Sequence, residues 1–286
     1  METVGVNVTH DASFCRCVNG EIDMFLEEER LSRKKHDNMP VKTVMELQES
    51  NFAGVTGLEY HDYSLRDTCN FFDVIFRKKI PDHDYRTYNQ HHYLHACCGF
   101  YNSGFEEADV VVVDGLGNFF DEENHECATR WHIKKPAEIK LLERQGASRF
   151  GTKTDRHGYW PMGVGMAYAS ISDYLGFGQL GSGKVMGLAP YGKEDPNIKP
   201  FVIDGRVNSK LFYRTKYSAN FIPYDYLPEE VNIKDQRFMN LAYRLQKDFE
   251  KWMTDFILKC EFKNIVLTGG CALNCVANSK IKNKNI

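Results

Sequence analysis

The order of expected strands at the start of this chain limits its possible folds more than any other feature. Residues 3–8, 13–18 and 21–26 carry strand patterns, and Asn19-Gly20 between the last two is typical of a two-residue hairpin turn. A charged helix start follows at Glu27. Three antiparallel strands before any helix disfavour a dinucleotide-binding unit, in which a helix follows the first strand.

A similar order of elements returns in the second part of the chain. Residues 108–114 form an almost uninterrupted apolar run, which is typical of a strand buried on both faces. Residues 127–133 and 138–144 then alternate as a hairpin does. We therefore expect an α/β protein of two similar lobes, residues 1–105 and residues 106–286.

The remaining patterns divide into helices and glycine-rich or irregular segments. A glycine-dense stretch covers residues 176–187 and predicts a loop, and residues 193–235 read as an irregular insertion with short strands. A buried strand is expected at residues 264–268, and because only one further helix follows it, we expect the second lobe to be incomplete. Helices are expected at residues 40–50, 64–78, 89–103, 163–176, 236–259 and 272–283.

Composition and charge exclude several classes of protein. The chain has 286 residues, with 36 basic and 39 acidic side chains and a net charge of -3, which gives no support for a nucleic-acid-binding or membrane-binding surface. No signal peptide and no membrane-spanning run is recognisable. With nine cysteines at spacings that do not suit a zinc site, we expect free thiols and a cytoplasmic location.

Two histidines and an aspartate form the strongest candidate site. His91 and His95 are four residues apart, so on a helix both rings project from one face, whereas His92 points elsewhere and is left outside the ligand set. Asp114 ends the buried strand at a glycine turn. Two imidazoles and a carboxylate suit a divalent metal with open positions. The alternative is that the histidines are surface or core residues held by hydrogen bonds.

Three polar or glycine-rich turns are weaker candidates. The turn from His10 to Ser13 and the turn from Gly269 to Asn274 could each meet a phosphate with backbone N–H groups, or be ordinary turns. The segment Gly181-Ser182-Gly183-Lys184 lacks the spacing of a phosphate loop, but its glycines would let a ligand approach the backbone.

These motifs together resemble the O-carbamoyltransferase family, which includes the nodulation-factor and antibiotic carbamoyltransferases. The resemblance runs from residue 3 to about residue 281 and is far more specific than any single motif. It rests on six motifs in one order: Gly5-Val6-Asn7 with His10-Asp11-Ala12-Ser13, the charged run of residues 27–36, His91-His92-Tyr93-Leu94-His95-Ala96, Val113-Asp114-Gly115, residues 183–192, and residues 269–278.

The resemblance implies a fold, a reaction and a set of ligands. It implies a two-lobed fold of the actin-like, sugar-kinase type. It implies that a carbamoyl group passes from carbamoyladenylate, made from carbamoyl phosphate and ATP, to the hydroxyl of a small-molecule acceptor. It also implies an iron ion, Fe²⁺, held by His91, His95 and Asp114. Family members carbamoylate several kinds of acceptor, and the sequence does not choose among them.

The resemblance also assigns roles to individual residues. His10 is the candidate general base for the acceptor hydroxyl, and Lys35 is placed to meet anionic groups. Gly269, Gly270 and Asn274 are expected to cradle the nucleotide. Gly183 and Lys184 are further candidate cofactor contacts.

This chain departs from the family pattern in two ways. Ser182 stands where family members usually have glutamate, which could alter the choice of acceptor. The adenylate-forming domain and a later Gly-Asp motif are absent, so we expect a C-terminal polypeptide to complete the fold and the reaction. The rival interpretations are an enzyme like the tRNA threonylcarbamoyl transferases, which the charge disfavours, and a non-catalytic nucleotide-binding subunit.

Overall fold

The computed structural model divides the chain into two compact units, Met1–Leu94 and His95–Ile286. It describes residues 2–7, 11–38, 41–43, 45, 54–56, 91–148, 154–214, 219–282 and 284–286. The division falls earlier than the boundary expected at residue 105, and it falls inside helix α4 (His91–Asn102). Because α4 is one continuous helix that packs on the second sheet, we describe it with the second unit.

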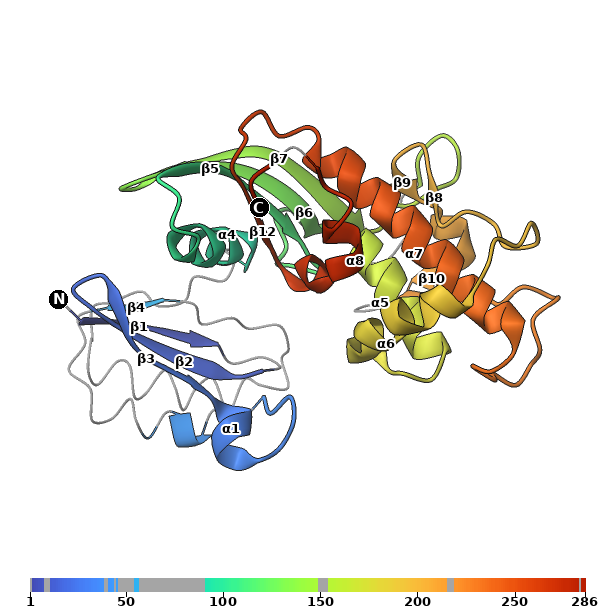
Figure 1. Ribbon diagram of the computed structural model, residues 1–286, viewed down its shortest axis with the longest axis horizontal. Coiled ribbons are helices and arrows are strands. Elements are labelled where there is room, and N and C mark those ends of the chain that lie inside the picture. The colour runs from blue at the N-terminus through green and yellow to red at the C-terminus, as the bar shows by residue number, and fades with distance from the viewer. Residues whose placement is uncertain are drawn as a thin grey trace. The chain divides into compact units, whose positions relative to one another are not determined.

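The first unit is built on a four-stranded sheet. Its order is β3-β2-β1-β4, and β1, β2 and β3 are antiparallel neighbours while β4 runs parallel to β1. Asn19 and Gly20 have φ of 53° and 89°, which confirms the predicted hairpin turn. A short helix follows β3 (Figure 1). The elements are β1 (Glu2–Asn7), β2 (Ser13–Val18), β3 (Glu21–Glu27), α1 (Glu28–Ser32) and β4 (Gly54–Thr56).

The second unit repeats this strand order. Its four-stranded sheet reads β7-β6-β5-β12, with β5, β6 and β7 antiparallel and β12 parallel to β5. Two sheets with the same order confirm the predicted repeat and the mixed α/β class. The strands are β5 (Glu107–Val113), β6 (Asn124–Lys134), β7 (Glu138–Ser148) and β12 (Ile265–Thr268).

Strand β5 is covered on both faces, as its apolar run predicts. Val111 and Val113 belong to the main core cluster with helices α5 and α7. Side chains alternate along a strand, so Val110 and Val112 point to the opposite face. There α4 packs so closely that a Cβ on Gly99 would lie 2.9 Å from Val266 of β12 (Figure 1).

The remaining elements of the second unit confirm some expectations and correct others. The glycine-dense stretch predicted as a loop contains helix α6, and the helix expected at 272–283 is a 3₁₀ turn followed by the short α8. The insertion holds short strands, as expected. The elements are α5 (Val164–Tyr174), η2 (Gln179–Gly181), α6 (Ser182–Leu188), η3 (Ala189–Tyr191), β8 (Val202–Ile203), β9 (Arg206–Val207), η4 (Ser209–Leu211), β10 (Phe212–Arg214), β11 (Ala219–Phe221), α7 (Gln236–Ile257), η5 (Gly270–Leu273) and α8 (Cys275–Asn278).

Helix α7 is the longest described helix, with 22 residues. Asp235 caps its start by accepting a hydrogen bond from Arg237 N at 2.9 Å. Phe238, Leu241 and Leu245 recur at helical spacing and are buried, which confirms the predicted core face. Among the described helices, none is both long and apolar enough to cross a membrane. The helix expected at 64–78 and most of that at 40–50 lie outside the described residues.

Candidate metal centre

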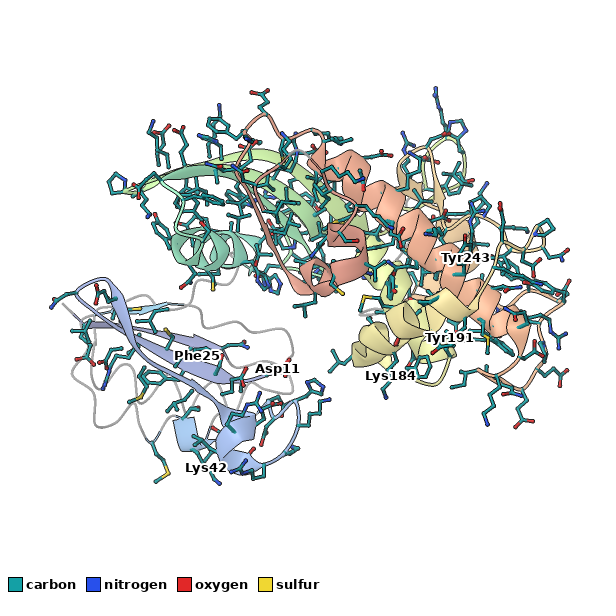
Figure 2. All side chains as sticks on the ribbon, viewed as in Figure 1. Asp11, Phe25, Lys42, Lys184, Tyr191 and Tyr243 are labelled. Carbon is teal, nitrogen blue, oxygen red and sulfur yellow. The ribbon has the colours of Figure 1, made fainter. Side chains whose placement is uncertain are left out.

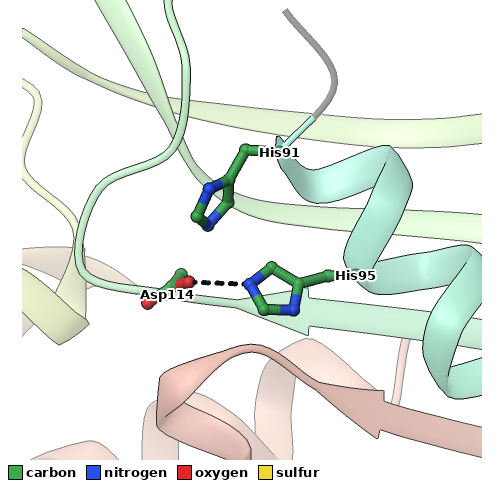
Figure 3. A group of neighbouring side chains, drawn as sticks. All are labelled: His91, His95 and Asp114. Carbon is green, nitrogen blue, oxygen red and sulfur yellow. Dashed lines mark ion pairs between the residues drawn. The ribbon is translucent and has the colours of Figure 1, made fainter. Parts of the chain in front are cut away.

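Helix α4 and strand β5 bring His91, His95 and Asp114 together, as the sequence predicts (Figure 3). The two histidines occupy the first two turns of α4 on one face. Asp114 directly follows β5 and continues the alternation of Val110 and Val112, so it lies on the side of the sheet that α4 covers.

The three side chains are close enough to share one ion. One ligand atom from each of His91, His95 and Asp114 lies within 4.8 Å of the other two. His95 Nε2 is 3.3 Å from Asp114 Oδ2. The other carboxylate oxygen, Oδ1, accepts a hydrogen bond from Gly115 N at 2.7 Å, which orients the group. All three residues are partly exposed, so a ligand can reach them.

This donor set fits the metal that the family resemblance implies. Two imidazoles and one carboxylate on one side of an ion are the ligands of non-haem Fe²⁺ sites, and they leave the remaining positions open. The carboxylate supplies the negative charge that favours a divalent cation. His92, which points elsewhere, is fully buried beside the ring of His91, with ring centroids 5.6 Å apart.

Three glycines let the backbone close around Asp114. A Cβ on Gly270 would lie 3.0 Å from Asp114 Oδ1, and one on Gly165 of α5 would lie 2.5 Å from the Asp114 carbonyl oxygen. Gly269 has φ of 85°, and its Cβ would lie 2.5 Å from the Val113 carbonyl oxygen. Larger residues would push the turn away from the end of β5. Gly269 is therefore required by its contact with the end of β5, and Gly270 lies against the Asp114 carboxylate.

Cys271 lies in the same turn, next to the carboxylate. Burial of its thiol raises the pKa of Cys271 well above its usual range, and the negative charge of Asp114 raises it further. No pattern along the chain indicated that Cys271 and Asp114 are neighbours, because the two residues are far apart in the sequence.

Gly183 and Lys184 lie in helix α6 rather than in the expected glycine loop. A Cβ on Gly183 would meet nothing within 4 Å, so no close approach requires a glycine there. Lys184 is exposed and its Nζ lies 5.8 Å from the centre of the Phe177 ring (Figure 2). The glycine-loop prediction is wrong because these residues form helical hydrogen bonds, while Lys184 keeps an amine that a ligand can reach.

Asn274 is committed to hydrogen bonds within the protein. Its side chain is buried, and its Oδ1 accepts from Ala277 N at 3.0 Å, which caps α8. It also forms a reciprocal amide pair with Gln246 of α7, at 2.9 and 3.1 Å. The sequence did not indicate Gln246, which reads there only as one polar residue of an amphipathic helix.

The remaining predicted residues belong to the first unit. His10 lies outside the described residues, and Lys35 is exposed in the turn after α1. Beside Lys35, His36 Nδ1 lies 2.8 Å from Asp11 Oδ1, and His36 N donates to Glu29 Oε2 at 3.0 Å. This second cluster was missed, although the charged run of residues 27–36 contains two of its members.

Comparison with known proteins identifies one family and several distant relatives. The family model described as "Carbamoyltransferase N-terminus" matches residues 63–286. The nodulation protein NolNO of Sinorhizobium fredii is 24% identical over 97% of this chain and 43% of its own length. An uncharacterised protein of Methanocaldococcus jannaschii is 27% identical over 98% of this chain and 52% of its own length.

One further relative and one solved structure are also similar to this chain. An uncharacterised protein of Synechocystis is 24% identical over 97% of this chain and 52% of its own length, so the chain spans about half the length of the curated relatives it matches. A Listeria monocytogenes protein described as an N-acetylmannosamine kinase aligns with 100% of this chain and 92% of its own, at 8% identity and a TM-score of 0.40. That score is too low to support an inference about fold.

Proposed function

Because the chain belongs to the carbamoyltransferase N-terminus family, we propose that it carries the transfer site of an O-carbamoyltransferase. The proposed reaction moves a carbamoyl group from carbamoyladenylate, made from carbamoyl phosphate and ATP, to an acceptor hydroxyl. The observation that supports it best is the approach of His91, His95 and Asp114 ligand atoms to within 4.8 Å of one another. The family match supports the reaction, and the closeness of these three side chains supports a metal ion at the transfer site.

The described residues suit the binding of Fe²⁺ at this centre. His91 and His95 would each offer a ring nitrogen from consecutive turns of α4. Asp114 would offer Oδ2, because Gly115 N already holds Oδ1. A bound divalent ion would supply positive charge that offsets the charge on a departing phosphate.

The remaining candidate residues would handle the nucleotide and the proton. Gly269 and Gly270 would let the ligand lie against the backbone next to Asp114. Lys184 offers an exposed amine for an anionic group. His10 is proposed to accept the proton of the acceptor hydroxyl, and Lys35 to meet anionic groups.

We further propose that a C-terminal polypeptide takes part in the complete reaction. The chain covers 52%, 43% and 52% of the three relatives described above. Strand β12 lies at one edge of the described sheet, and Asn285 forms a parallel bridge beside it with Asn264. An additional strand could therefore extend the sheet at this edge. We place the reaction in the cytoplasm, where thiols such as those of Cys127 and Cys260 would stay reduced.

Anaerobic calorimetry with Fe²⁺ tests the metal centre on the whole chain. We expect about one ion per chain, and an affinity at least about 100-fold lower in His91→Ala and Asp114→Asn, because the first loses an imidazole ligand and the second replaces a charged carboxylate with a neutral amide. His157→Ala is the matched control, since His157 is an exposed histidine of the second unit whose ring contacts Arg156. Equal Fe²⁺ binding by wild type and His91→Ala would contradict the proposal.

Carbamoyladenylate binding then separates the rival interpretations. We expect the ligand to bind more tightly with Fe²⁺ present, and carbamoyl transfer to a hydroxyl acceptor to require addition of the C-terminal half of a relative. Binding of bulk tRNA would favour an enzyme of the tRNA-modifying type. Nucleotide binding without turnover in the presence of the C-terminal half would favour a non-catalytic subunit.

A further inference from the structure

A buried network of polar side chains lies behind the candidate metal centre. Its members come from three separate elements of the second unit: Tyr168 of α5, Gln246 and Glu250 of α7, and Asn274 at the start of α8. Their exposed fractions are 5%, 3%, 7% and 9%. Buried polar groups are costly unless each finds a partner, so such a network demands an explanation.

Gln246 is the centre of this network. Its Oε1 accepts from Tyr168 OH at 2.7 Å and from Asn274 Nδ2 at 2.9 Å. Its Nε2 donates to Glu250 Oε1 and to Asn274 Oδ1, both at 3.1 Å. All four hydrogen-bonding positions of the amide are therefore filled. The amide can adopt only one orientation, and it links α5 to the start of α8.

Both elements that Gln246 links also contact Asp114. Gly165 lies one helical turn before Tyr168 on α5, and a Cβ there would be 2.5 Å from the Asp114 carbonyl oxygen. Gly270 begins the turn that ends at Asn274, and its Cβ would be 3.0 Å from Asp114 Oδ1. Asp114 therefore lies between two glycine contacts, and Gln246 hydrogen-bonds to both of the elements that supply them.

We propose that Gln246 is a positioning residue, which holds helix α5 and the Gly270–Leu273 turn at the distance that orients Asp114 for metal binding. This inference rests on the proposed metal centre. Groups that orient a metal ligand without touching the ion typically change affinity by about 10–100-fold when removed. The family resemblance assigned Asn274 to direct contact with the nucleotide. Under this proposal Asn274 instead holds the Gly270–Leu273 turn.

The test measures Fe²⁺ affinity by anaerobic calorimetry on the whole chain. Gln246→Leu removes all four hydrogen bonds at similar volume, and we expect an affinity about 10–100-fold below wild type. Asn274→Asp keeps the acceptors for Ala277 N and Gln246 Nε2 but loses the N–H that Gln246 Oε1 accepts, so it is the milder variant. Tyr168→Phe cuts only the link to α5, and we expect the smallest loss.

Asn240 provides the matched control on the same helix. It is an amide of 4% exposure, and its partners are Lys193 N, Gln236 Nε2 and Asp195 Oδ2 rather than any group that contacts Asp114. Asn240→Leu should lower the melting temperature and leave Fe²⁺ affinity within about twofold of wild type, because it disturbs a buried amide elsewhere.

The possible outcomes are distinct. Weaker Fe²⁺ binding in Gln246→Leu and Asn274→Asp, with normal binding in Asn240→Leu, supports the proposal. Unchanged affinity in every folded variant overturns it, as does an equal loss in Asn240→Leu. If Gln246→Leu does not fold, Asn274→Asp and Tyr168→Phe decide in the same way. A wild-type chain that binds no Fe²⁺ would instead overturn the metal centre itself, and this inference with it.

Discussion

The two sheets share one strand order but differ in how their first strands are buried. In β1, Val4 and Val6 are buried while Thr3 is exposed. In β5, every residue from Ala108 to Val113 is buried. The shared strand order places β1 and β5 at equivalent positions in their sheets. The two strands differ because both faces of β5 are buried, so its end is surrounded by packed elements. At the end of β5, Asp114 lies among packed backbone from two other elements, which is the setting in which a carboxylate is held in one orientation.

An aspartate placed in each of the first strands, β5 and β1, should give the largest difference in the free energy of unfolding. Val112→Asp places an unpaired charge in a covered position of β5, and we expect a loss of more than about 4 kcal/mol in the free energy of unfolding. Thr3→Asp on the exposed side of β1 should cost about 1 kcal/mol or less. Denaturant unfolding measures both. Similar losses at the two sites would show that β5 is not more deeply covered than β1.

Two glycines with positive φ sharpen the contrast at the turns. Gly269 and Gly20 have φ of 85° and 89°, but only Gly269 faces an atom, the Val113 carbonyl oxygen, that a Cβ would clash with. Gly20→Ala should therefore cost about 1–2 kcal/mol for the left-handed backbone alone. Gly269→Ala should cost about 3 kcal/mol or more, because strain and clash add. The measurement is again denaturant unfolding, and equal costs would contradict the close contact.

Each unit also contains an aspartate–histidine pair. His132 Nδ1 lies 3.0 Å from Asp109 Oδ1, with side-chain exposures of 16% and 1%, whereas the His36–Asp11 pair is 38% and 45% exposed. His132→Ala leaves the buried Asp109 carboxylate without one of its hydrogen-bond partners. Because the backbone N–H groups of residues 261 and 262 still donate to Asp109, we expect a loss of about 3 kcal/mol in the free energy of unfolding.

The exposed His36–Asp11 pair should contribute much less to the free energy of unfolding than the buried pair. We expect His36→Ala to lower the unfolding free energy by about 1 kcal/mol at most, because the pair is exposed and water can replace its hydrogen bond. Thermal unfolding of both variants at neutral pH checks the difference. A larger loss for His36→Ala than for His132→Ala would mean that the first unit depends on its histidine cluster for stability.

The smallest effect is expected at the starts of two helices. These are α1, which follows the hairpin strands of the first sheet, and α7, which follows the irregular insertion. Helix α1 begins after Glu27, which makes no side-chain cap, whereas α7 begins after Asp235, which does. Hydrogen bonds from the Arg237 side chain, and then from its backbone N–H, lower the pKa of Asp235 from 3.8 to about 2.

Because the pKa of Asp235 is lower in the folded state, its stabilising contribution is present above about pH 4 and is lost as the pH falls towards 2. Asp235→Asn keeps the cap acceptor but cannot titrate. We expect the variant to melt slightly below wild type at pH 5 and together with it near pH 2. A difference in melting temperature that persists at pH 2 would exclude titration of Asp235 as its cause.

Local patterns predicted the parts of the molecule that depend on local physics. The Asn19-Gly20 turn, the strands of both sheets other than β4, and the closeness of His91, His95 and Asp114 follow from hairpin chemistry, alternation and helical spacing. Helix α6 was missed, because glycines weaken a helix in isolation and here its packing against α5 and α7 outweighs that cost.

Contacts between distant parts of the chain could not be predicted. Gln246 and Asn274 are 28 residues apart, and Asp109 accepts from Glu261 N at a separation of 152 residues. Neither pairing has a signature in one sequence, since each partner alone is an ordinary polar residue. The packing of α4 on the second sheet is a contact of the same kind, since Gly99 lies against Val266 and Thr268 of β12.

The pairing of β12 with β5 has a consequence for the order of folding. Helix α4 and the hairpins of β5, β6 and β7 need only nearby segments of chain, but Ile265 pairs with Asp109 after most of the second unit has intervened. Contacts of such long range form slowly, because closing a long loop costs chain entropy before any contact rewards it. We expect Gly270 to reach Asp114 only when β12 pairs with β5. The candidate metal centre would therefore form late, after helix α4 has already placed its two histidines.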